Sequence, residues 1–362
     1  MLQQYKKMNF RKNKKYIKLK SITTIKEKFT FDIGLAVLRP ILSFFVIFTH
    51  CYDHNSAYGK WKEIMIKANY FRFHVPTFFI ISFYFTCKTL ISSNYKKKFE
   101  RLQRLFIPYF LWPIIVFLLN KLLLVYSIAK EDITFSILKF QLLYGIGENG
   151  MGILWFQWNL IFITLLFILI IFIFKKNYNL ILIVITITAF IYQYNGKNKF
   201  YFSKKDVLGR ILEMIPFAVI GFLISDSEII IFLKKHRLKT VITCIYLLYF
   251  ITNYQVINKA KGFNYHGIRL FIMSICVFIT FVMFPSEKIK NKIIIKIIKQ
   301  ITSYTAGIYY IHAKFSSYIS NYIESIKNRT IKGCIIIYLL CYLISFLGIL
   351  IFGKTKLRHL FI

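Results

Sequence analysis

The sequence predicts an all-α, polytopic membrane protein, a helical bundle of about ten transmembrane helices with both termini in the cytoplasm. Of its 362 residues, 57% are hydrophobic and 19% are aromatic, which is too apolar for a soluble fold of this length. Apolar runs of roughly 20 residues, enough to cross a bilayer, recur along the chain and are separated by lysine clusters. The run ILWFQWNLIFITLLFILIIFIF, which starts at Ile153, is one of them.

Ten apolar segments define the expected helices, and the basic clusters define their boundaries. The predicted helices are 33–52, 74–91, 105–127, 153–174, 179–194, 214–232, 238–253, 266–285, 301–319 and 331–352. A single membrane domain, 33–352, is therefore expected between a basic N-terminal tail, 1–32, and a short basic C-terminal tail, 353–362.

The placement of lysine and arginine predicts the side of the membrane on which each loop lies. With ten helices, the strongly basic segments all fall on the cytoplasmic side: 1–32, 92–104, the Lys175-Lys176 turn, 233–239 and 286–299. The 128–152 loop is not basic and falls outside. The 195–213 loop is an exception to this rule, because it should be external yet is strongly basic. Either it folds back as an external amphipathic segment, or the helix count is wrong nearby.

The formal charge of +36 does not indicate nucleic-acid binding, because the basic residues lie in short loops between apolar segments. In that position they set topology and contact anionic head groups, so membrane lipids are the expected partner. The six cysteines have neither the spacing of a zinc site nor that of a disulfide framework, and no metal site is expected. Cys51 is notable because it adjoins His50.

The first predicted helix carries two ionisable side chains, Arg39 and His50, in the run LRPILSFFVIFTHC. They are eleven residues apart, which is about 20° beyond three full turns, so both point from one face roughly 16 Å apart. Ionisable groups inside a bilayer are costly and usually functional, and a histidine of near-neutral pKa can act as a general base. The alternative is that both side chains merely extend to the two membrane interfaces.

A second basic pair precedes the third predicted helix in KKKFERLQRLFIPYFLW. Arg101 and Arg104 are three residues apart and are therefore neighbours on a helical face. Paired guanidiniums bind phosphate oxygens bidentately, so this pair suits a phosphate-bearing ligand. Ordinary positive-inside charge explains the lysines better than it explains this spaced pair.

Four segments, taken in order, resemble motifs of acyltransferase family 3. These are integral membrane acyltransferases that include the O-acetylases of bacterial surface polysaccharides. The segments are Arg39 to His50 in the first helix, HVPTFFIISFYF from His74, Arg101-Leu-Gln-Arg104 followed by Pro108, and TAGIYYIH ending at His312. The resemblance covers most of the chain.

By this resemblance, the chain is a multi-pass protein of the bacterial cytoplasmic (inner) membrane. It would transfer an acyl group, acetyl in the first place, from acyl-CoA to a hydroxyl of a surface glycan or a lipid-linked sugar. Acyl-CoA is a co-substrate, so no resident cofactor is expected. The catalytic residues would be His50, as general base, and Arg39, and the substrate-binding residues would be Ser82, Arg101, Arg104, Tyr309 and His312.

One departure from the family concerns Ser82, which is followed by Phe83 where the family usually has Ser-Gly. We expect the bulky ring to narrow a channel or to alter the acyl group that is accepted. His312 could instead be a packed core histidine bonded to a tyrosine, and an acyl-enzyme on His50 or Cys51 remains as an alternative chemistry.

Two other classes of protein remain open. A transporter or flippase for a lipid-linked glycan would also have a basic inner entrance and a polar stripe on a membrane helix. Against it, the sequence has no pair of matching broken helices and no intramembrane carboxylate to couple protons. An inactive sensory or structural membrane protein would insert normally and transfer no acyl group.

Overall fold

The structure is a computed structural model, and within the residues that it describes every regular element is a helix. The described residues are 32–51, 72–127, 132–145, 154–195, 207–226, 228–257, 267–319, 322–323 and 330–360. The N-terminal tail, apart from Asp32, and most of the segment after the first helix lie outside them.

Each of the ten predicted ranges overlaps a helix. Helices α4 (His74–Ile91) and α16 (Ile331–Phe352) begin and end at the predicted residues. The other helices close to prediction are α2 (Ile33–Cys51), α7 (Trp155–Phe174), α8 (Tyr178–Asn195), α11 (Arg237–Ile257) and α12 (Ile268–Val282). Hydrophobic run length therefore locates these helices well, because each run must hold its backbone hydrogen bonds inside an apolar phase.

Two predicted helices are each divided in two. The range 214–232 overlaps both α9 (Val207–Asp226) and α10 (Ile229–Lys235), with a bend of 72° between them. The range 301–319 holds α14 (Thr305–Ile319) and the last residues of α13 (Lys292–Ser303). Because α9 begins at Val207, the end of the 195–213 segment is helical, and the lysines before it lie outside the described residues.

Helix α5 (Tyr95–Val125) corrects the prediction that a loop extends to residue 104. It begins ten residues earlier than expected, at an N-cap where the Asn94 side chain accepts a hydrogen bond of 3.1 Å from the backbone N–H of Lys97. The lysines that follow exclude this segment from the hydrocarbon but not from the helix. As a result, Arg101 and Arg104 lie on the helix itself.

Among the described residues, five helical segments are long and apolar enough to cross a membrane, or six if α9 and α10 form one bent span. One of the five, Trp155–Tyr194, is 40 residues long, about twice the length needed for a crossing. It is divided at Lys175, which has a φ of 43° and starts the short helix η3 (Lys175–Asn177). The total of ten spans and the cytoplasmic placement of both termini stay predictions.

Two helices were not expected from the sequence. Helix α6 (Phe135–Tyr144) returns beside α5, where the Tyr109 hydroxyl donates to backbone carbonyls of α6. Helix α13 is amphipathic: its three lysines share one face, and exposed isoleucines such as Ile293 lie beside them. Another side of the helix is fixed by Thr302, whose hydroxyl donates to the Ala36 carbonyl at 2.6 Å. Such a helix is typical of a membrane surface.

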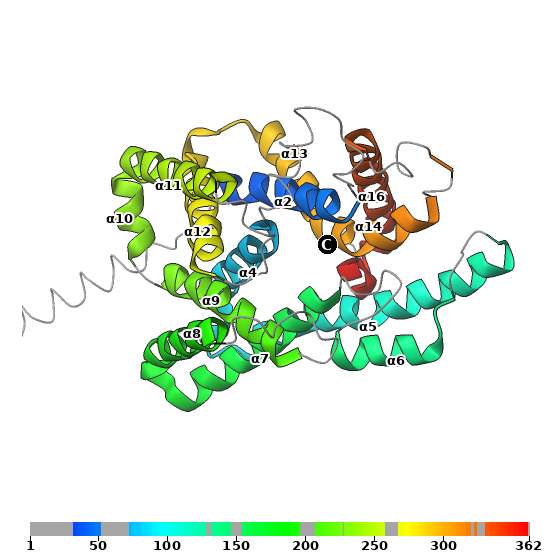
Figure 1. Cartoon of the computed structure of the whole chain (residues 1–362), viewed down its shortest axis with the longest axis horizontal. Coiled ribbons are helices and arrows are strands. Elements are labelled where there is room, and N and C mark those ends of the chain that lie inside the picture. The colour runs from blue at the N-terminus through cyan, green and yellow to red at the C-terminus, as the bar shows by residue number, and fades with distance from the viewer. Residues whose placement is uncertain are drawn as a thin grey trace, which may run out of the picture.

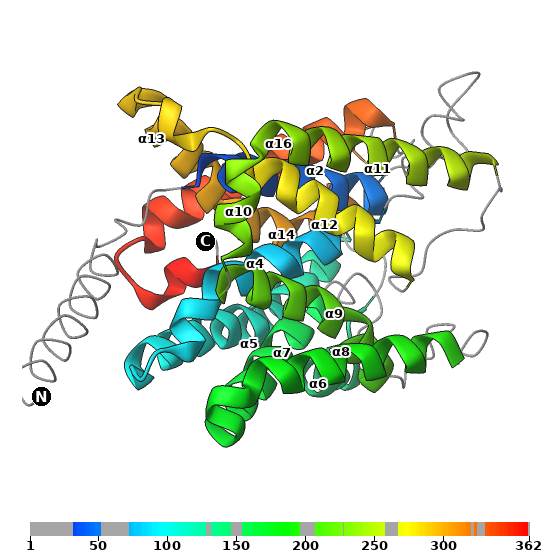
Figure 2. The same ribbon diagram turned by 90° about the vertical axis from the view of Figure 1, so that its left-hand side faces the viewer.

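The centre of the bundle is formed by α2, α4, α9 and α14 (Figure 1). Helices α4 and α9 approach closely because Gly221 has no side chain, and a Cβ there would lie 2.3 Å from the Ile80 carbonyl oxygen. In both views, α7 and α8 lie side by side along one edge and α11 covers α12 at the opposite one (Figures 1 and 2). The C-terminal helix η5 (Lys356–Leu360) packs between α5 and α16.

Candidate active site

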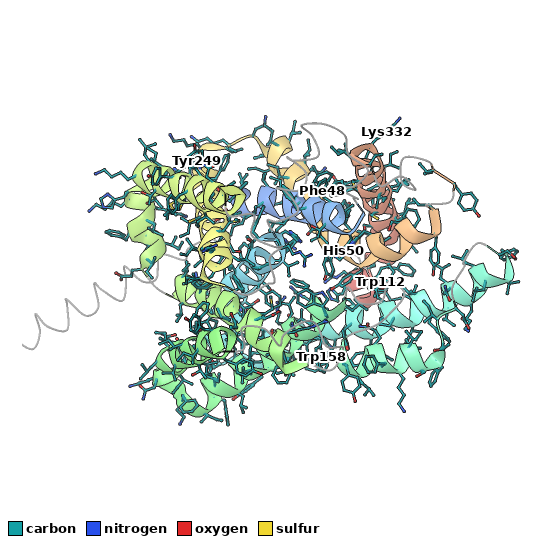
Figure 3. The ribbon with its side chains drawn as sticks, in the orientation of Figure 1. Phe48, His50, Trp112, Trp158, Tyr249 and Lys332 are labelled. Carbon is teal, nitrogen blue, oxygen red and sulfur yellow. The ribbon has the colours of Figure 1, made fainter. Side chains whose placement is uncertain are left out.

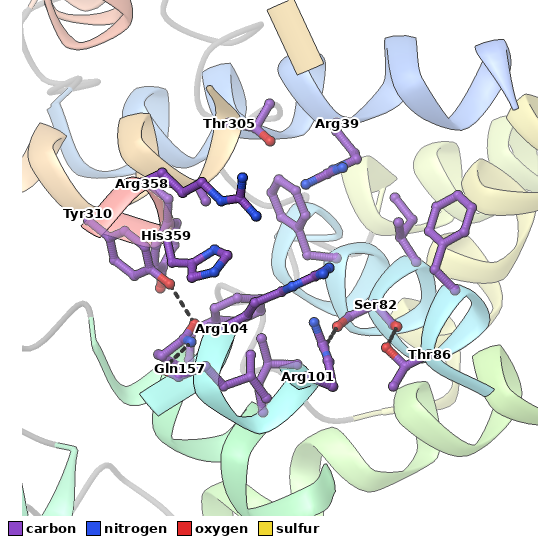
Figure 4. A pocket seen from close by; sticks show the side chains of 18 residues that line it. Arg39, Ser82, Thr86, Arg101, Arg104, Gln157, Thr305, Tyr310, Arg358 and His359 are labelled. Atoms are coloured by element: carbon purple, nitrogen blue, oxygen red, sulfur yellow. Dashed lines mark hydrogen bonds between the residues drawn. The ribbon is translucent and has the colours of Figure 1, made fainter. Parts of the chain in front are cut away.

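Six helices, α2, α4, α5, α7, α14 and η5, surround a cavity of about 590 Å³. Figure 4 shows the eighteen side chains that line it, which come from both halves of the chain. This volume is in the range of pockets that bind cofactors and small ligands. The cavity is therefore large enough to hold a substantial part of a nucleotide-sized molecule.

The cavity is strongly positive. Its lining includes one histidine, His359, and no Asp or Glu. Four of the other lining residues are arginines: Arg39, Arg101, Arg104 and Arg358. Figure 4 shows guanidinium groups converging on the space from α2, α5 and η5. Like charges held this close repel one another, so the arrangement favours binding of a polyanion that places phosphate or carboxylate oxygens among them.

Arg101 connects two of the sequence motifs. Its Nη2 donates a hydrogen bond of 2.6 Å to the Ser82 hydroxyl on α4, which explains why a serine of one motif faces the arginine of another. The Nε atom of Arg101 is buried and has no hydrogen-bond partner among the described residues. A buried donor of this kind is available to an anionic ligand.

Phe83 does not have the position that the sequence suggested. Its ring is fully buried and packs against Phe167 of α7, with ring centroids 4.8 Å apart, and it is not among the residues that line the cavity. Successive helical residues point about 100° apart, so Ser82 can face the cavity while Phe83 faces the core. The expected narrowing by this ring is therefore wrong for this cavity.

A buried hydrogen-bonded chain holds three walls of the cavity together. The Tyr310 hydroxyl on α14 donates to Gln157 Oε1 on α7 at 2.7 Å, and Gln157 Nε2 donates to the Leu105 carbonyl on α5 at 2.9 Å. Buried polar groups that are fully paired in this way fix the relative positions of the helices that carry them. Tyr310 of the TAGIYYIH motif thus has a structural contact that the motif alone did not reveal.

The two histidines of the motifs lie together at the far end of α2. The ring centroids of His50 and His312 are 5.4 Å apart, and Figure 3 marks His50 at this end of the helix. His312 is fully buried, and its Nδ1 lies 2.7 Å from the Tyr309 carbonyl oxygen, so Nδ1 must carry the proton. Its buried Nε2 has no hydrogen-bond partner among the described residues and offers a lone pair.

Tyr309 joins the arginine cavity to the histidine pair. Its ring lines the cavity, and its centroid is 5.9 Å from that of His312. Arg39 lines the same cavity beside α14, and His50 meets α14 through His312. Both side chains of the first motif thus face α14, in agreement with their eleven-residue spacing.

Residues 32–354 match the model of acyltransferase family 3, which is described as an acyltransferase domain. The chain belongs to acyltransferase family 3. It is therefore a membrane acyltransferase that takes an acyl donor and an acceptor. No curated protein and no solved structure matches the chain.

The family assignment and the cavity do not cover the same residues. All the motif residues lie inside the range that matches acyltransferase family 3, whereas Arg358 and His359 lie beyond its end at residue 354. Both lie in the short basic C-terminal tail expected from the sequence, and nothing in their local pattern identifies a cavity. The side chain of Cys51, the other nucleophile considered, lies outside the described residues.

His359 is affected by its surroundings at the edge of the cavity. Partial burial lowers its pKa, and the neighbouring guanidiniums of Arg104 and Arg358 lower that pKa further. The imidazole is therefore neutral at a pH where a solvated histidine would already bind a proton. An anion placed among the three groups would reverse this effect.

Proposed function

We propose that the protein is an O-acyltransferase that moves an acyl group, acetyl in the first place, from acyl-CoA to a hydroxyl of a cell-envelope glycan. The observation that carries the proposal is that a cavity lined by four arginines lies next to a pair of histidines, with the Tyr309 ring lining the cavity and lying 5.9 Å from that of His312. The arginine cavity suits the multiply charged nucleotide end of acyl-CoA, and the histidine pair suits proton transfer.

In this proposal, Arg39, Arg101 and Arg104 bind the phosphates of the donor. Arg39 and His50 are separated by about 16 Å along α2, so the pantetheine arm extends beside α14 and brings the thioester toward the histidine end. Contacts to the donor phosphates, far from the reacting carbon, hold the donor in place and so position that carbon for attack.

The chemical step is an acyl transfer to oxygen. The acceptor oxygen attacks the thioester carbon as His50 takes the hydroxyl proton, and a tetrahedral intermediate forms. The carbon–sulfur bond then breaks, the thiolate of coenzyme A leaves, and the proton on His50 passes to that sulfur. The lone pair on His312 Nε2 can accept a hydrogen bond from His50 and so hold the ring in one tautomer.

The test is acyl transfer from radiolabelled acetyl-CoA to cell-envelope glycans, in membranes that contain the wild-type protein or a His50→Ala variant at matched abundance. We expect label in the glycan fraction with the wild type and its loss with the variant. His236→Ala is the matched control, because His236 is exposed at the junction of α10 and α11 and does not line the cavity.

Two results would contradict the proposal. If His50→Ala transfers label as fast as the control, His50 is not the base. If the wild type transfers no label from acetyl-CoA or from longer acyl donors, the activity lies elsewhere. Transport of a lipid-linked glycan should then be measured in the same membranes.

A further inference from the structure

We propose that η5 is part of the donor-binding site, and that Arg358 and His359 bind the phosphate monoester of coenzyme A. This inference rests on the proposed function and extends it to a segment beyond the residues that match the family. Arg358 and His359, which belong to none of the sequence motifs, thereby become part of the donor site.

The first argument is the position of η5. The indole Nε1 of Trp112 on α5 donates a hydrogen bond of 2.9 Å to the Leu360 carbonyl, and Leu360 is only 4% exposed. The helix also packs against α16. Residues 358 and 359 are therefore held at the cavity by the buried residue that follows them.

The second argument is the charge that η5 adds. Without it, three guanidiniums line the cavity; with it, a fourth guanidinium and an imidazole lie opposite Arg104 (Figure 4). Arg104 and Arg358 are both exposed, whereas Arg101 is less exposed and is bonded to Ser82. The cavity thus has an inner anion-binding position at Arg101 and an outer one between Arg104 and η5.

The third argument is the chemistry of the ligand. Coenzyme A carries a diphosphate and, separately, a phosphate monoester on its ribose, so two anion-binding positions match its two charged groups. A guanidinium fork binds the oxygens of a dianionic monoester bidentately, and a neighbouring imidazole adds a further donor. The buried, unpartnered Nε of Arg101 suits the diphosphate, which enters first with the pantetheine arm.

The experiment measures binding and transfer separately. Equilibrium binding of radiolabelled coenzyme A and of 3′-dephospho-coenzyme A is determined for membranes with wild type, Arg358→Gln, Arg358→Lys or Lys354→Gln. Transfer from the two acetylated donors is then measured for KM and kcat. Lys354 is the matched control, since it is exposed, basic and close in sequence but does not line the cavity.

We expect Arg358→Gln to weaken binding of coenzyme A about tenfold and to raise KM by a similar factor, with kcat within about twofold. The wild type should bind dephospho-coenzyme A as weakly as Arg358→Gln binds coenzyme A. Arg358→Gln should bind dephospho-coenzyme A almost as well as the wild type does. Arg358→Lys should retain part of the affinity, because the charge remains without the fork.

Equal effects of Arg358→Gln on both ligands, or no effect on either, would overturn the inference while leaving His50-dependent transfer intact. If the wild type neither binds coenzyme A nor transfers the acyl group, the proposed function fails and this inference fails with it. Variant abundance is measured in every sample, and Arg358→Lys provides a result if Arg358→Gln does not accumulate.

Discussion

The arginine end and the histidine end of the site differ in how many groups share each task. At the arginine end, guanidiniums from α2, α5 and η5 converge on one cavity, so several charges are available to one ligand. At the histidine end, His50 and His312 form a single ring pair between α2 and α14. In the proposed function, binding is therefore distributed over many side chains, whereas proton transfer depends on one imidazole and its neighbour.

The largest expected effect tests whether the two ends are separable. His50→Gln should lower kcat by roughly 10²–10⁴-fold, the usual contribution of a general base, because glutamine cannot accept the hydroxyl proton. Coenzyme A binding should stay within about twofold, since the arginine cavity does not include His50. Steady-state kinetics and equilibrium binding check this. A parallel loss of binding would mean that the two ends act as one site.

The second effect tests the ring pair itself. His312→Gln should lower kcat roughly tenfold and shift the pH at which kcat reaches half its maximum, because in the proposed function the lone pair of His312 orients His50 and the substitution displaces it. A pH profile of kcat separates this role from packing. If His312 were only a core histidine held by the Tyr309 carbonyl, protein abundance would fall and the pH profile of the surviving enzyme would not move.

The third effect compares two arginines of the same cavity. Arg101→Gln should raise KM for the donor about tenfold, and Arg104→Gln about threefold, because Arg101 is fixed by Ser82 whereas Arg104 is exposed. Neither should change kcat by more than about twofold. Initial rates over a range of acetyl-CoA concentrations provide the measurement. A collapse of kcat in either variant would contradict the division of tasks between the two ends.

The smallest effect concerns pH at the edge of the cavity. The pKa of His359 is lowered by burial and by Arg104 and Arg358, and a bound dianion should raise that pKa, so donor binding takes up a proton. The KM for acetyl-CoA should therefore fall from pH 8 to pH 7, by at most about tenfold. Among the described residues that line the cavity, His359 is the only histidine, and none is Asp or Glu.

His359→Gln provides the control for that measurement. The substitution should flatten the dependence of KM on pH. Titration of the donor phosphate contributes equally in the variant and the wild type, so it does not account for a difference between them. An identical pH dependence in the variant and the wild type would show that His359 takes no proton on binding. Because KM and kcat are extracted separately, the titration of the base at the histidine end does not interfere.

The sequence determined where most helices are and which residues share a face. Run length located α4 and α16 to the residue, because an apolar backbone must satisfy its hydrogen bonds within one helix. Helical periodicity put Arg39 and His50 on one side of α2. The ordered motifs predicted the family, and the match over residues 32–354 confirmed it.

Other features depended on contacts between distant segments. Local pattern could not reveal that Arg101 bonds to Ser82, that Phe83 packs against Phe167, or that η5 reaches the cavity. The start of α5 was also missed, because lysine clusters mark the edge of the hydrocarbon and not the end of a helix.

The division has a simple physical reason. Hydrophobic run length and a repeat of 3.6 residues are local properties, so the sequence by itself determined the helices and the faces of their polar side chains. Which faces meet depends on packing between helices far apart in the chain, as at Gly221 and Trp112. Only the tertiary structure decided that four arginines would share one cavity and that His50 and His312 would lie together beside α14.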